Sequence, residues 1–63
     1  MPLNLDPRLP DPDGFYAELI ACLRDLDEAQ AERFQARLLL ILANQVGDPE
    51  VLAQALQLAR AGL

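Results

Sequence analysis

The sequence of 63 residues has no histidine, lysine, serine or threonine, and Cys22 is its single cysteine. An active site needs a group whose proton or electron pair is usable near neutral pH, most often one of these residue types. Serine and threonine nucleophiles and lysine or histidine bases are therefore excluded. Cys22 falls on the apolar side of a predicted helix, where a thiol is typically an inert core residue. We expect a protein that is not an enzyme and has no catalytic residues.

The same absences argue against metal and cofactor sites. One cysteine without histidine forms neither the Cys/His cluster of structural zinc nor an internal disulfide. Glu28 and Glu32 have helical spacing but lack the histidine partners of a di-metal bundle, so solvated acids explain them better. The three glycines are isolated, which excludes a glycine-rich phosphate loop. We expect no bound metal and no cofactor.

Positive charge is scarce as well, since five arginines stand against ten acidic residues and the net charge is -5. A nucleic-acid binder needs a concentrated positive surface, so nucleic acid is not an expected partner. The longest unbroken apolar run covers residues 38–43, far short of the roughly 20 residues of a membrane-spanning helix. With a lone thiol and no basic-then-apolar leader pattern, the sequence predicts a cytoplasmic protein with no membrane contact.

The amino-terminal segment, residues 1–11, is rich in proline, which lacks a backbone donor and pushes the preceding residue toward extended conformations. We predict an extended arm that docks on the helices, with a frayed terminus as the equal alternative. A docked arm would alternate its side chains, with Leu3, Leu5 and Leu9 on one surface and Asn4 and Arg8 in water.

Start and stop signals divide the remaining chain into helices. Asp11-Pro12-Asp13 and Asp48-Pro49-Glu50 each place an aspartate cap before a proline, and Asp27 with Gln30 forms a capping pair. Gly47 is suited to a helix carboxyl end. The predicted fold is all-α: a single three-helix domain over residues 12–63, with helices at about 12–26, 28–46 and 49–61. Their short links force neighbours to run antiparallel or to cross steeply.

Apolar residues at intervals of three and four predict the inward faces of the first and third helices. Gln54 is expected to point outward from the third helix. The predicted inward residues are Phe15, Leu19, Cys22 and Leu26 in the first helix, and Leu52, Ala55, Leu56 and Ala59 in the third.

The middle helix carries more apolar surface than two short neighbours are expected to cover. Its residues 38–43 are all apolar, and consecutive helical positions point about 100° apart, so these side chains occupy almost the whole circumference. The neighbours can cover the side of Leu38, Ile41 and Leu42. The remaining residues predict a contact with another chain: Leu39, Leu40, Ala43 and Val46. The alternative is a crossed packing in which the arm shields them.

Two arginines extend this predicted interface. Arg33 and Arg37 lie four residues apart on one face and are suited to docking acidic groups. Because Glu28 and Glu32 form a similar pair about a quarter turn away, the two pairs could exchange across the two-fold axis of a homodimer. A solvated charged face is the simpler alternative.

Three segments, LDPRLPDPDGFYAELI, RLLLILANQVGDPEVLAQAL and ARAGL, resemble a family of short bacterial proteins of unknown function over nearly the whole chain. Its members open with an Asp-Pro-rich arm and Phe-Tyr, and continue with an Arg-Leu-x-Leu-x-Leu-Ala-Asn helix before Gly-Asp. The resemblance implies an accessory protein acting with a metabolic oxidoreductase, since relatives are often encoded beside flavin-dependent aromatic hydroxylases. It supplies no site residues.

Taken together, these features predict a small non-catalytic protein-interaction module, an accessory or scaffold protein. Its partner would be a second copy, giving a homodimer, or an enzyme subunit. The rival hypothesis is an acidic antagonist that occupies a basic surface on a nucleic-acid-binding protein or toxin. The scattered positions of the acidic residues favour the first hypothesis, because an antagonist would concentrate them in a block.

Overall fold

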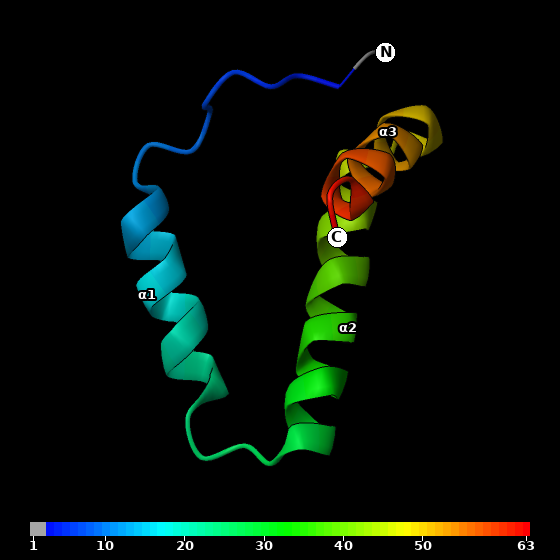
Figure 1. Ribbon diagram of the computed structural model, residues 1–63. Helices are drawn as coiled ribbons and strands as arrows, with labels where there is room; N and C mark the ends of the chain where they lie inside the picture. Colours follow the sequence, from blue (N-terminus) through cyan, green and yellow to red (C-terminus); the bar gives the residue numbers. More distant parts are fainter. Residues whose placement is uncertain (1–2) are drawn as a thin grey trace.

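The computed structural model describes residues 3–63 as three helices, which begin at the predicted caps. They are α1 (Pro12–Leu23), α2 (Glu28–Val46) and α3 (Pro49–Arg60) (Figure 1). No strand occurs within residues 3–63. The predicted all-α, three-helix fold is therefore confirmed.

Aspartate side chains cap each helix. At α2 the Asp27 carboxylate accepts a hydrogen bond from the Gln30 backbone N–H at 2.8 Å. The Gln30 side-chain oxygen accepts in turn from the Asp27 N–H at 3.2 Å, which completes the predicted capping box. The caps of α1 and α3 are also aspartates, each followed by proline at the start of the helix. These local bonds satisfy amide groups that a helix start leaves unpaired.

Helix ends differ slightly from the prediction. The first helix was expected to reach about residue 26, but α1 ends at Leu23 because Arg24 is extended and Asp25 adopts the left-handed conformation, with φ 64°. Aspartate tolerates that conformation better than most residues. The end of α2 is as predicted: Gly47 has φ 69° and its N–H donates to the Ala43 carbonyl. The third helix ends one residue earlier than expected.

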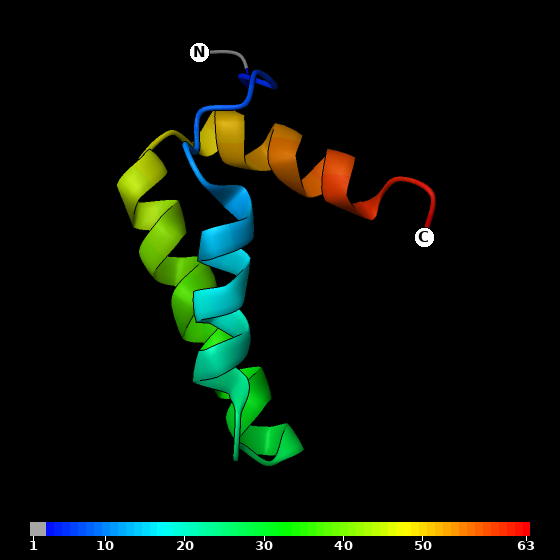
Figure 2. The same cartoon turned by 90° about the vertical axis from the view of Figure 1, so that its left-hand side faces the viewer.

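The helices spread apart instead of closing around a centre. α1 and α2 run in opposite directions along a narrow V, and α3 crosses the carboxyl end of α2 at a steep angle (Figures 1 and 2). α3 packs against α2 at that end. The radius of gyration is 13.5 Å, whereas a compact domain of this length has about 11 Å. The single chain is thus open.

This openness leaves the chain without a core. No side chain within residues 3–63 is buried, although more than half of the sequence is hydrophobic. The better-covered apolar side chains are only half-buried: Leu3, Leu19, Leu23, Leu26, Ala31, Phe34, Leu38, Ala43, Val51, Leu52 and Ala55. Each of them stays partly exposed, and none is enclosed.

The predicted inward faces of α1 and α3 are therefore covered only in part. Cys22 is exposed and not a core residue, and Phe15 is 41% exposed. On α3 the better-covered side includes Val51, while Leu56 is 65% exposed. The prediction was wrong at these positions because it assumed that each stripe meets a neighbouring helix, and the helices splay too far for that.

The arm is attached at one end. The Leu3 N–H donates to the side-chain oxygen of Gln54 at 2.7 Å, so Gln54 binds the arm and does not point outward as predicted. Leu5 and Leu9 are 72% and 52% exposed, so they do not pack as the docked arrangement required. The predicted arm also included residues 1–2, which lie outside the described residues. A bond at Leu3 thus holds an arm whose other leucines face solvent.

Removing the cap of α2 tests how much this fold depends on local bonds. We expect Asp27→Ala to lower the free energy of unfolding by about 1 kcal/mol, because the Gln30 N–H loses its acceptor. Asp27→Asn keeps an acceptor oxygen and should stay within a few tenths of a kcal/mol of the parent. Urea unfolding followed by far-UV circular dichroism measures both. Equal losses in the two variants would contradict the role assigned to the cap.

Candidate protein-binding surface

The side of α2 that faces α1 is marked by half-buried residues. Ala31, Phe34 and Leu38 recur at intervals of three and four and share this side. Ile41 and Leu42 were expected to be covered with Leu38, but they are 59% and 45% exposed. The reason is geometric, since the distance between α1 and α2 increases toward the carboxyl end of α2 (Figure 1).

The opposite side of α2 carries the predicted interface. Leu40 is 71% exposed, Leu39 59% and Val46 51%, while Ala43 is half-buried. At about 100° per residue, Ala43 points roughly opposite to Phe34, so this group lies away from α1. We call Leu39, Leu40, Ala43 and Val46 the outer patch. Exposed apolar side chains gathered on about two turns of helix form a surface suited to binding another apolar surface.

The two arginines of the predicted interface belong to another part of α2. Arg33 and Arg37 line a shallow hollow of about 380 Å³ between the end of α1 and the start of α2. Cys22, Leu26 and Phe34 share this hollow. Arg37 precedes Leu40 by three residues and Arg33 precedes it by seven, so both arginines lie along the Leu40 edge of the outer patch. The structure thus places both arginines at the amino end of the outer patch, where they also line the hollow.

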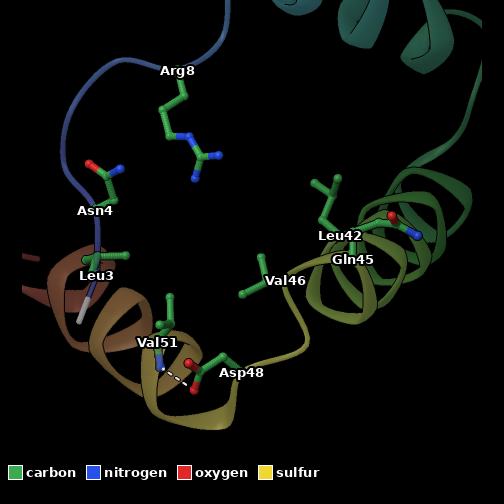
Figure 3. A pocket seen from close by; sticks show the side chains of 8 residues that line it. All are labelled: Leu3, Asn4, Arg8, Leu42, Gln45, Val46, Asp48 and Val51. Atoms are coloured by element: carbon green, nitrogen blue, oxygen red, sulfur yellow. Dashed lines mark hydrogen bonds between the residues drawn. The ribbon is translucent and has the colours of Figure 1, made fainter. Parts of the chain in front are cut away.

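A larger hollow, of about 570 Å³, lies where the arm passes the junction of α2 and α3. Arg8 and Asn4 point into it from the arm, opposite Leu42 and Val46 (Figure 3). The predicted alternation of the arm is thus wrong in part: Leu3 faces the hollow, but Asn4 and Arg8 do so too. Sequence reasoning missed this hollow because only the angle between helices creates it. The remaining lining residues are Gln45, Asp48 and Val51.

Residues 3–63 offer no cluster of three or more histidine, cysteine, aspartate or glutamate side chains that could hold a metal ion. None of the helices described combines the length and the apolar character needed to cross a membrane.

The comparison with protein-family models matches residues 3–61 to the family described as "Protein of unknown function (DUF2783)". The chain belongs to this family. The predicted resemblance to a short family of unknown function is thereby confirmed, and in this DUF2783 member the match covers the arm from Leu3 together with all three helices. No curated protein and no solved structure matches the chain.

The bond between the arm and α3 can be tested by proteolysis. We expect Gln54→Ala to increase trypsin cleavage after Arg8 severalfold, because the arm loses its attachment and samples more of the conformations a protease requires. Gln57→Ala, an exposed glutamine on the same helix, is the matched control. Mass spectrometry of timed digests gives the rates. Equal cleavage rates in the parent and Gln54→Ala would show that the bond does not hold the arm.

Proposed function

We propose that this protein is a small non-catalytic interaction module, an accessory or scaffold protein that acts through the outer patch of α2. The observation that carries the proposal is the absence of any buried side chain within residues 3–63, in a sequence that is 52% hydrophobic. Exposed apolar surface is unfavourable in water by about 25 cal/mol per Å². A partner that covers it supplies the burial that the chain cannot supply itself.

The composition of the outer patch supports a binding role. Its leucines lie on a regular helix, which fixes their positions, and the stretch from residue 38 to residue 47 has no charged side chain. Apolar side chains on a rigid element are suited to the centre of an interface, and charges suit its edge. Arg33, at the edge of the outer patch, would set the orientation of a partner more than its affinity.

The proposed partner is a second copy of the chain or a subunit of an enzyme such as the oxidoreductase that the family resemblance implies. The proposal places this interaction in the cytoplasm, where a lone thiol such as Cys22 stays reduced. In this role the protein contributes surface and not chemistry, so loss of the outer patch removes its function without affecting any catalytic step of its own.

Capture from native extract tests the outer patch directly. Tagged parent chain is compared with the double variant Leu39→Glu/Leu40→Glu, and bound proteins are quantified by mass spectrometry. We expect the specifically retained proteins to fall at least about tenfold with the double variant, because two charges placed in an apolar contact cost several kcal/mol. The matched control, Ala17→Glu/Ala53→Glu, adds the same charge at two exposed positions of α1 and α3 and should retain them.

The identity of the retained protein separates the hypotheses. A metabolic enzyme or a second copy of the chain supports the accessory role. A basic nuclease or transcription factor would instead support the acidic antagonist. If the parent, the double variant and the control all retain the same proteins in the same amounts, binding does not involve the outer patch and the proposal is wrong.

A further inference from the structure

We infer that the side of α2 opposite α1 binds a second copy of this chain, with the two α2 helices antiparallel about a two-fold axis that passes between them at the level of residue 41. The inference rests on the proposed function and names its partner. Three properties of this side of α2 support it: the seven-residue spacing of its small residues, the match of its large side chains to its small ones, and its distribution of charge.

The spacing is that of a helix-pairing seam. Alanines recur every seven residues along the outer side of α2, at Ala29, Ala36 and Ala43; three residues after each stand Glu32, Leu39 and Val46, so the seam is apolar from Ala36 onward. Apolar residues at alternating intervals of three and four form the contact line of paired helices. Ala29 and Ala36 are exposed, and α1 lies on the other side of α2 (Figures 1 and 2). The small side chains allow a second helix to approach closely.

The second property is that this side of α2 is complementary to a second copy of itself. A single two-fold axis pairs its large side chains with its small ones. Leu39 and Ala43 lie two residues on either side of Ile41, and Ala36 and Val46 lie five residues on either side. An antiparallel two-fold axis at the level of residue 41 therefore places Leu39 against Ala43 of the second copy and Ala36 against its Val46. A two-fold interface is self-complementary by definition, so both matches occur twice. A parallel pair would instead place each seam residue against its own equivalent.

Charge favours the same arrangement. All charged residues of α2 lie in its first ten residues, and its last turn has no basic side chain. Antiparallel pairing about Ile41 overlaps the uncharged halves and carries Arg33 to the carboxyl end of α2 in the second copy, where helix carbonyls make the end negative. Parallel pairing would place Glu32, which lies on the seam between Ala29 and Ala36, against Glu32 of the second copy, which is unfavourable.

A crosslinking experiment tests the pairing in the full chain, with Cys22→Ser removing the native thiol. Leu39→Cys and Ala43→Cys are made in separate chains, and disulfide formation is compared for each chain alone and for their mixture. Antiparallel pairing about Ile41 brings positions 39 and 43 together, within the roughly 7 Å between Cα atoms that a disulfide allows, but keeps each position away from its own equivalent. We expect the mixed disulfide to form about tenfold faster than either symmetric one.

Two results would overturn the inference. Faster crosslinking of Leu39→Cys with itself would show parallel pairing. If each variant alone and their mixture all form disulfides at the rates measured for the unfolded chains, the second copy is not the partner. In the latter case, capture of a different protein that depends on Leu39 and Leu40 would still support the proposed function, so the two failures are distinguishable.

Leu40 supplies an independent variant pair that does not depend on thiol chemistry. Each Leu40 lies one residue from the proposed axis, at the same edge of the seam, so the two Leu40 side chains meet. Leu40→Glu alone and Leu40→Lys alone should sediment as monomers, because like charges then face each other. An equimolar mixture should recover the dimer through opposite charges. A mixture that remains monomeric while the parent dimerises would contradict the position of the axis.

Discussion

The other two helices of the chain are too short to cover the apolar surface of α2, and the rest of the structure follows from this constraint. α1 and α3 each have 12 residues and α2 has 19. The links between them are short, so α1 can lie along only part of α2, while α3 turns away where α2 ends. α3 and the arm approach only the Val46 end of the outer patch, and Leu39 and Leu40 stay exposed. The helices are therefore set by their own caps, and their packing remains incomplete.

The sequence predicts the helices well because their determinants are local. Asp27 with Gln30, the two Asp-Pro pairs and Gly47 act through bonds within a few residues, and the structure contains each of them. The end of α1 was less predictable because no glycine marks it, and the left-handed residue is Asp25. Start and stop signals thus fix the elements even where tertiary packing is weak.

The angles between helices were beyond prediction, because they depend on distant contacts that leave no periodic signal. The covered faces of α1 and α3 were therefore wrong at Cys22 and Leu56, and the role of Gln54 as acceptor for the arm was missed. The outer patch was predictable because an apolar run longer than one face of a helix leaves some side chains without a neighbour. Its identity as an interface stays a prediction, as does the proposed role of Arg37.

An open chain of this kind is stabilised by whatever covers it, so folding and binding become coupled. A domain of about 60 residues is marginally stable even when it closes around a core. Association then raises stability in proportion to the logarithm of partner concentration. The same leucines that weaken the isolated chain would stabilise the complex, which gives a physical reason for a short chain to carry them.

Sedimentation equilibrium of the isolated protein from micromolar to millimolar concentration, with helix content followed in parallel, tests this account most directly. The account predicts a mass that rises with concentration from the single-chain value of 6.9 kDa toward twice that value, and helix content that rises with it. A single chain that stays monomeric, fully helical and cooperatively folded at the highest concentration would contradict it.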